Sequence, residues 1–267
     1  MSAPSITLNA SPQLRHVLRL ADTCLIHAQR LGEWCGHGPV LEEDIALTNL
    51  ALDLLGQARA LLTHAAALDG QGHDEDRLAF LREEGDYLNL TLVEQPMRRS
   101  SAHAPGGDFA DTVVRNLLVC TWLRLHWQQL VDSRDAELAA IAGKALKESR
   151  YHVEHAVDWT VRLGDGTAES RLRMQAALER AWPHVSELFA DDEVDDAAAA
   201  AGWGPRRGAL REAWRAEIGA VLQRATLALP ADSPLLSRGS RGVHSEHMGF
   251  ILAEMQYLQR AYPGGRW

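Results

Sequence analysis

Apolar residues recur every three or four positions along most of the chain, a spacing that predicts α-helices rather than strands. In the first such stretch Leu14, Leu18, Leu25 and Leu31 fall on one helix face, and the breakers at 36–39 end the helix. We find no alternating strand pattern and no internal repeat of about 20 to 50 residues. The chain is therefore expected to be all-α.

A second stretch, 41–68, is apolar nearly all round, which is typical of a helix in the middle of a bundle. The third helix, 108–131, begins at Asp108, a good N-cap. After a turn at 133–134 the fourth helix runs to Gly164. Four long helices joined by turns and one longer excursion predict a helical bundle.

The other predicted elements are shorter. Further helices are expected at 76–89, 172–189, 207–227 and 244–262, and loops at 100–107 and 237–242. Pro183 is expected to kink the helix that contains it. We expect one domain over 1–267, with a core bundle at about 11–164 and C-terminal helices at about 165–267.

Composition narrows the class of protein. Hydrophobic residues make up 46% and charged residues 24%, as in ordinary globular proteins. The net charge of -9 argues against nucleic-acid binding, which needs clustered Lys and Arg. Three widely spaced cysteines form no metal or disulfide motif, which favours a reducing cytoplasm. We see no signal peptide and no uncharged apolar run of about 18 residues, so no membrane span is expected.

The helix at 144–164 carries the first candidate chemistry. Glu148, His152 and His155 point in roughly one direction, because residues three or four apart share a helix face. In ferritin-like bundles, di-iron sites are built from inward Glu residues and Glu-x-x-His pairs. Yet no Glu or Asp in this chain has a His three residues later. A di-iron site here would need a divergent ligand set.

Glycine and tyrosine stand where such pairs would place histidine: Gly56 follows Asp53 and Tyr151 follows Glu148. We therefore interpret the region as a degenerate metal site that has become a buried polar network and holds no metal. Arg115 or Arg150 would balance its charge. The predicted network consists of Asn49, Asp53, Gln57, Glu148, Tyr151 and His152.

Two C-terminal motifs offer weaker candidates. His244-Ser245-Glu246-His247 places two histidines one turn apart, but zinc proteases need His-Glu-x-x-His, so we favour capping and interhelical contacts over a metal. Arg238 and Arg241 lie among glycines before a helix start, an arrangement that can hold a phosphate. We favour an exposed loop with solvated arginines. No P-loop, dinucleotide motif or catalytic-triad signature is present.

Several motifs are distributed along the chain: Arg30–His37, Ala51–Arg59, Val93–Pro96, Lys147–His152, His244–His247 and Leu252–Arg260. Together they resemble one family, the C subunits of bacterial phenylacetyl-CoA epoxidase (ring-1,2-phenylacetyl-CoA monooxygenase). The resemblance covers about 14–267. The chain departs from the family pattern in its longer polar N-terminus and in an insertion around 99–105.

This resemblance implies a ferritin-like but non-catalytic cytoplasmic subunit without a cofactor of its own. Its partners would be a related catalytic A subunit, which carries the di-iron site, and other epoxidase subunits. An NADPH-dependent reductase would supply electrons for epoxidation of phenylacetyl-CoA in aerobic phenylacetate catabolism. The resemblance also implies a contribution to acyl-CoA binding, with surface helix and loop as the alternative. The residues concerned are Asp86, Tyr87, Leu88, Asn89, Asp196, Ala197 and Ala198.

Three hypotheses follow. The first is a structural subunit of the epoxidase. The second is an independent di-iron oxygenase with divergent ligands, and the third is an acyl-CoA-binding helical module without catalysis. Iron content and binding of phenylacetyl-CoA by the isolated chain discriminate among them.

Overall fold

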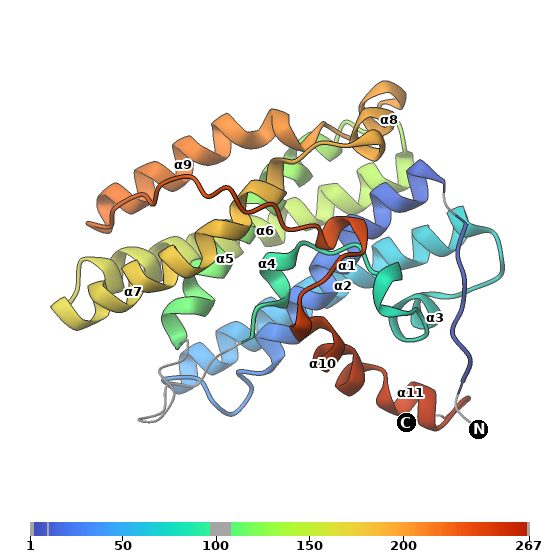
Figure 1. Cartoon of the computed structure of the whole chain (residues 1–267), viewed down its shortest axis with the longest axis horizontal. Coiled ribbons are helices and arrows are strands. Elements are labelled where there is room, and N and C mark those ends of the chain that lie inside the picture. Colours follow the sequence, from blue (N-terminus) through green and yellow to red (C-terminus); the bar gives the residue numbers. More distant parts are fainter. Residues whose placement is uncertain (1–2, 10, 97–107, 266–267) are drawn as a thin grey trace. The chain divides into compact units, whose positions relative to one another are not determined.

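The computed structural model describes residues 3–9, 11–96 and 108–265, and within these ranges every regular element is an α-helix or a short 3-10 helix (Figure 1). The all-α prediction is confirmed, and the helices are consistent with a ferritin-like bundle. The predicted loop at 100–107 and the insertion around 99–105 are outside the described residues. Contacts define two compact units, Met1–Gln95 with Ser237–Trp267, and Pro96–Leu236. The single-domain organisation stays a prediction.

The first unit is built on two long helices, α1 (Pro12–Gly32) and α2 (Leu41–Asp69), which pack side by side (Figure 1). The Ser11 hydroxyl accepts a hydrogen bond from the Leu14 N–H at 3.3 Å and so caps α1. Gly70 ends α2 with a φ of 68°, a conformation that glycine adopts without strain. By length and composition α2 is long and apolar enough to cross a membrane, a property that it shares with the core helices of soluble proteins.

Shorter elements complete the first unit. They are α3 (Glu75–Phe80), η1 (Glu84–Asp86), α4 (Thr91–Glu94), η4 (Gly239–Arg241), α10 (Glu246–Met255) and α11 (Tyr257–Ala261). The helix predicted over 76–89 is wrong beyond Phe80, because Arg82 turns inward to a buried partner and 87–90 has no regular secondary structure. The final helix is interrupted at Gln256, whose side chain binds the Arg82 carbonyl at 3.0 Å.

The second unit contains α5 (Phe109–Leu130), α6 (Ala136–Gly164), α7 (Ala168–Ala181), η2 (Trp182–Phe189), α8 (Glu193–Ala201), η3 (Arg207–Leu210) and α9 (Arg211–Arg224). Asp108 caps α5 as predicted, in a capping box with Asp111. Pro183 does more than kink its helix. The α-helix ends at Ala181 and the chain continues as a 3-10 helix.

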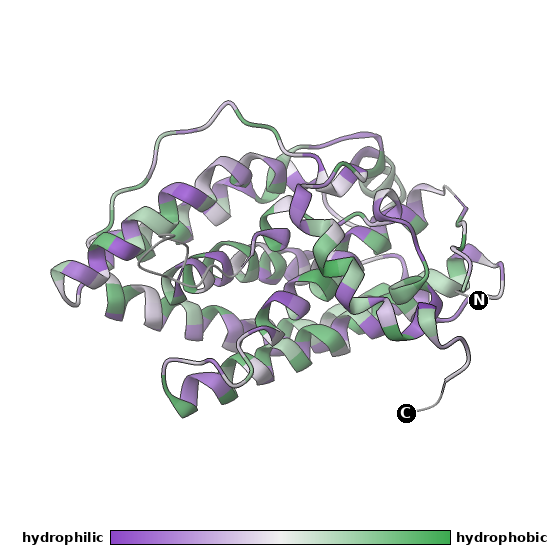
Figure 2. Ribbon diagram, turned by 60° about the horizontal axis from the view of Figure 1, so that its bottom comes forward, coloured by the Kyte–Doolittle hydropathy of each residue, from purple (hydrophilic) through white to green (hydrophobic). Residues whose placement is uncertain are grey.

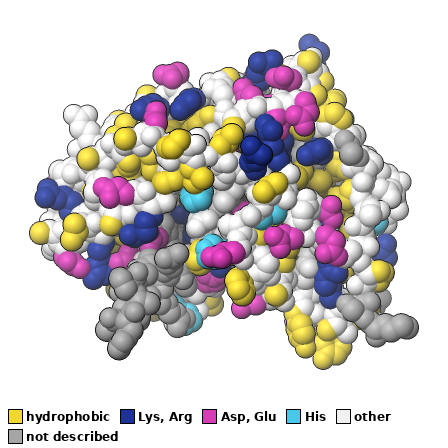
Figure 3. Space-filling view, viewed as in Figure 1, with side chains coloured by type: hydrophobic (Ala, Val, Ile, Leu, Met, Phe, Trp, Pro, Cys, Tyr) yellow, Lys and Arg dark blue, Asp and Glu magenta, His cyan; other side chains and the backbone are white. Residues whose placement is uncertain are grey.

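Both units have their own apolar cores. Leu14, Leu50 and Leu54 are fully buried in the first unit, and Trp122 and Trp214 are nearly so in the second. Each of these two indoles donates to a backbone carbonyl, of Leu188 at 2.8 Å and of Leu118 at 2.9 Å. Hydrophobic and hydrophilic residues are interspersed along the helices (Figure 2). Side chains of both charge signs are mixed on the face drawn in Figure 3.

Candidate functional site

The most connected polar region of the first unit is the segment 82–94, which leads from α3 to α4. Arg82 is fully buried and forms an ion pair with Asp22 of α1, which is also fully buried. Arg82 Nη1 also donates to the Asp86 carbonyl at 2.9 Å, and Asp22 Oδ2 accepts from the Leu88 N–H at 2.8 Å. A charge pair without access to water is tolerated only when its remaining polar atoms are satisfied, as they are here.

Tyr87 lies beneath this ion pair and is fully buried. Its hydroxyl donates to the Ala79 carbonyl at 2.6 Å and accepts from Gln256 Nε2 at 2.8 Å. The Arg82 guanidinium lies 4.1 Å from the ring centroid, a cation–π contact. Burial raises the pKa of Tyr87 to about 12, against the opposing effect of Arg82. The phenol therefore stays neutral and acts as a packing and hydrogen-bonding group.

Glu94, the last residue of α4, is fully buried with both carboxylate oxygens engaged. Oε1 accepts hydrogen bonds from Asn89 Nδ2 at 3.0 Å and from His244 Nδ1 at 2.7 Å. Oε2 accepts from the backbone N–H and the hydroxyl of Ser245, at 2.8 and 2.7 Å. Ser245 is the N-cap of α10, so Glu94 fastens the start of α10 to α4. We call these four residues the Glu94 clamp.

His244 is held as an imidazolium within the clamp. Its Nε2 lies 2.9 Å from the Tyr87 carbonyl oxygen, which can only accept a hydrogen bond. Because Nδ1 faces the Glu94 carboxylate, both ring nitrogens act as donors. Burial lowers the pKa of His244, but the hydrogen bond and charge of Glu94 outweigh it, and the pKa lies above its usual 6.5.

Arg30 and the turn at 239–240 contact residues of the Glu94 clamp and of α4. Arg30 donates to the Glu94 carbonyl from Nε at 3.0 Å and from Nη2 at 2.6 Å. The Gly239 N–H donates to Thr91 Oγ1 at 3.0 Å, and a Cβ at Gly239 would lie 2.5 Å from the Asn89 carbonyl oxygen. The glycine here serves a close backbone approach. Gly239 and Ser240 are thus packed in a buried turn, whereas Arg238 and Arg241 are exposed, as the loop prediction expected.

The arrangement binds elements together and leaves little room for chemistry on a substrate. The capping and interhelical roles predicted for His244 and Ser245 are confirmed. Glu94 and Tyr87 are fully buried, and their polar atoms are occupied by protein partners. A catalytic acid or base must reach the proton that it moves, which these groups do not.

The segment predicted for acyl-CoA binding, 86–89, is part of this cluster. Tyr87 and Asn89 are fully buried and Leu88 is 6% exposed, whereas Asp86 is exposed. The Asp86 carboxylate accepts from the Glu83 N–H at 3.1 Å and caps η1. In this conformation only Asp86 presents its side chain to solvent. A role of these residues toward acyl-CoA stays a prediction.

The other predicted binding residues lie on α8 in the second unit. Asp196 is exposed and pairs with Arg206 at 2.9 Å, Ala197 is half-buried, and Ala198 is fully buried. The Ala198 carbonyl accepts the N–H of Trp203 at 2.9 Å, which closes the end of α8. Nearby, Arg207 and Asp195 form a buried ion pair that fixes the helix start. These contacts define a well-anchored helix, and the acyl-CoA role again stays a prediction.

The six residues of the predicted polar network divide by burial. Gln57 and His152 are buried, Asp53 and Glu148 are intermediate, and Asn49 and Tyr151 are exposed. The description as a buried network is therefore wrong for Asn49 and Tyr151, because each lies on the solvent side of its helix. Gln57 accepts a weak hydrogen bond from Cys24 at 3.7 Å, and Glu148 lies 3.7 Å from Lys144 Nζ.

The two positions where the iron-binding pattern calls for histidine also lie outward. Gly56 is exposed on α2 with no atom within 4 Å of a Cβ built there, and Tyr151 on α6 is 51% exposed. Of the two positions suggested for a balancing arginine, Arg115 is buried and Arg150 exposed. Within the described ranges no three His, Cys, Asp or Glu side chains are grouped so as to hold a metal ion.

Sequence reasoning missed the pairing of Asp22 with Arg82 and of Glu94 with His244. Asp22 did carry a signal, since it interrupts an apolar helix face and such a charge needs a partner. Nothing local indicated which arginine that partner is. Glu94 and His244 are 150 residues apart, and their contact depends on the tertiary fold.

Comparisons with known proteins show the family of this chain. A family model described as phenylacetic acid catabolic protein matches residues 2–267. The chain belongs to this family. A curated relative, the C subunit of the 1,2-phenylacetyl-CoA epoxidase of Escherichia coli (strain K12), is 48% identical over 252 residues, which cover 94% of this chain and 98% of the relative. The family resemblance drawn from the motifs is confirmed.

Proposed function

We propose that this chain is a structural, non-catalytic subunit of a 1,2-phenylacetyl-CoA epoxidase that acts in aerobic phenylacetate catabolism in the cytoplasm. The observation that carries the proposal is the 48% identity to the C subunit of such an epoxidase, which extends over nearly the whole length of both proteins. The catalytic A subunit of the complex would carry the di-iron centre. An NADPH-dependent reductase would deliver electrons to it.

The placement of side chains supports a non-catalytic role. Gly56 and Tyr151, at the positions of the missing histidines, face away from the interior, where a bundle assembles its iron ligands. Three fully buried charged groups of the first unit, Asp22, Arg82 and Glu94, all have protein hydrogen-bond partners. Their contribution is to hold the subunit in shape.

An exposed apolar stripe on α2 supports assembly with a partner subunit. Leu41, Ile45 and Leu52 recur at helical spacing on one face and are 71%, 53% and 59% exposed. Gly56 continues the same face with open space around it, although a glycine inside a helix costs about 1 kcal/mol relative to alanine. Exposed apolar residues gathered on one helix face are typical of interaction sites, and a neighbouring subunit of the complex would remove them from water.

The test is reconstitution. The chain is co-expressed with the A-type subunit, and epoxidation of phenylacetyl-CoA is followed with reductase, NADPH and oxygen. We expect a stable complex, activity only when the A subunit is present, and no turnover by this chain alone. Turnover by the isolated chain would instead establish an independent oxygenase with divergent ligands.

Calorimetry with phenylacetyl-CoA separates the remaining alternative. A structural subunit binds the thioester only weakly without its partner, since its predicted contribution, 86–89 and 196–198, is mostly buried or paired. Tight binding by the isolated chain would identify an acyl-CoA-binding module. Alanine substitution of the exposed Asp86 then tests whether that segment takes part.

A further inference from the structure

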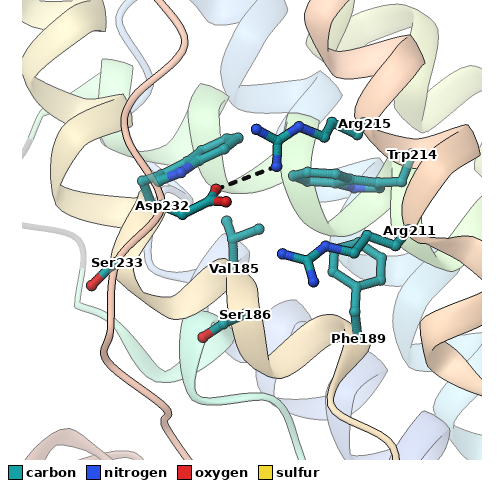
Figure 4. A pocket seen from close by; sticks show the side chains of 9 residues that line it. Val185, Ser186, Phe189, Arg211, Trp214, Arg215, Asp232 and Ser233 are labelled. Carbon is teal, nitrogen blue, oxygen red and sulfur yellow. Dashed lines mark hydrogen bonds and ion pairs between the residues drawn. The ribbon is translucent and has the colours of Figure 1, made fainter.

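A small pocket in the second unit lies between η2, the first turns of α9 and the extended segment at 232–233 (Figure 4). Its walls are aromatic and its rim is charged. Trp214 stacks in tilted geometry 5.9 Å from Trp182 and edge-on 5.2 Å from Phe189. The Trp214 indole is anchored by its hydrogen bond to the Leu118 carbonyl, so this wall is rigid. None of these residues belongs to the Glu94 clamp or the predicted acyl-CoA segments.

The size of the pocket restricts what it can hold. Its volume is about 40 Å³. A single water needs about 10–15 Å³ by this kind of measure, whereas a cavity that takes up benzene has about 150 Å³. The pocket therefore admits a group of a few heavy atoms and excludes an aromatic ring. A planar carboxylate group has the right size, with the rest of its molecule outside.

Two arginines supply the charge. Arg211 and Arg215 lie one turn apart on α9, and Figure 4 shows both guanidinium groups reaching towards Val185. Arg215 pairs with Asp232 at 3.3 Å. Arg211 has no hydrogen-bonding or ionic partner within the described part of the chain. The rim thus has two positive charges and one negative charge, which leaves one guanidinium to be neutralised.

Asp232 shows which chemistry this rim recognises. It is a carboxylate, it is largely exposed, and it comes from an extended segment between Pro230 and Pro234. The segment is fastened by the Ser186 hydroxyl, which donates to the Leu235 carbonyl at 2.6 Å. A second carboxylate meeting Arg211 would repeat the contact that Asp232 makes with Arg215. A doubly charged phosphate fits less well, because Asp232 repels a dianion more strongly than a monoanion.

We propose that this pocket is a binding site for the carboxylate group of a small organic acid, with Arg211 as its principal ligand. The planar guanidinium binds a carboxylate through two parallel hydrogen bonds. The aromatic wall of Trp182, Phe189 and Trp214 gives the group a flat, rigid surface. The site is independent of the proposed epoxidase role, because no residue in it is assigned to that function.

The test is an NMR titration of the full-length chain with sodium acetate, with sodium chloride at matched ionic strength as reference. The reporters are the Arg211 Nε–H and the Trp214 indole N–H signals. We expect saturable shifts with acetate that chloride does not produce. Shifts that rise linearly and equally with both salts would overturn the proposal, and so would tighter binding of inorganic phosphate than of acetate.

Three variants sharpen the result. Arg211→Gln should weaken acetate binding by about tenfold, as expected for loss of charge-assisted hydrogen bonds. Arg224→Gln is the matched control, since Arg224 is also exposed and is the last residue of α9, and this variant should bind acetate as tightly as the wild type. Asp232→Asn should tighten binding, because it removes the competing negative charge. Equal affinity of the Arg211 and Arg224 variants would contradict the assignment.

Discussion

Removing the Glu94 carboxylate should destabilise the first unit strongly. Glu94→Ala deletes the acceptor of four hydrogen bonds, from Asn89, from His244 and two from Ser245. It also leaves the His244 imidazolium buried without its counter-charge. Breaking a buried pair by removing one partner costs about 3–5 kcal/mol. Domains of ordinary stability unfold with about 5–15 kcal/mol, so the loss is a large fraction of the total.

The assay is urea unfolding followed by circular dichroism, with the free energy of unfolding obtained by linear extrapolation. Glu254→Ala is the matched control, since Glu254 is an exposed carboxylate on α10, and it should change stability by no more than about 0.5 kcal/mol. A double-mutant cycle with His244→Asn isolates the pair, and we expect a coupling of at least about 1 kcal/mol. If Glu94→Ala and Glu254→Ala cost the same, the clamp does not stabilise the fold.

Three further outcomes follow from the structure. The pKa of His244 is raised in the folded state, so protonation of its imidazole stabilises the fold fully below about pH 6.5 and less as the pH rises through the higher folded-state value. The urea midpoint of the wild type should therefore fall with rising pH more steeply than that of His244→Asn. Asp22→Asn leaves Arg82 buried without a counter-charge and should lower the free energy of unfolding by about 3–5 kcal/mol. A loss below about 1 kcal/mol would be typical of a surface ion pair, and it would contradict the burial of the Asp22–Arg82 pair. Leu52→Glu on the exposed face of α2 should leave the thermal midpoint unchanged but reduce recovery of the A-type subunit in co-purification, whereas Gln223→Glu on α9 should reduce neither.

The long helices were predictable because local rules decide them. Spacing of apolar residues placed α1, α2 and α5 to within a few residues, and Asp108 marked the start of α5 through its capping chemistry. Prediction failed at 81–89, where the predicted helix gives way to the short 3-10 helix η1 and irregular chain. The cause is Asp22, which draws Arg82 inward and accepts the Leu88 N–H, so tertiary contacts override local propensity.

The candidate site was predictable only in part. The motifs that contain Arg30, Glu94 and His244 were each recognised, but only the folded chain shows that they meet at one buried residue, with Arg30 at the Glu94 backbone carbonyl and His244 at its carboxylate. Burial was harder still to infer. Asn49 lies on α2, which is apolar nearly all round, and which side of such a helix faces solvent depends on its neighbours.

The central claim is that this chain supports oxygen chemistry without performing it. The most direct measurement is iron counting on each chain after co-purification with the A-type subunit and separation of the two under mild conditions. We predict two irons per A-type chain and no stoichiometric iron on this chain, whether alone or recovered from the complex. Two irons per copy of this chain, lost on substitution of Glu148 by alanine, would contradict it.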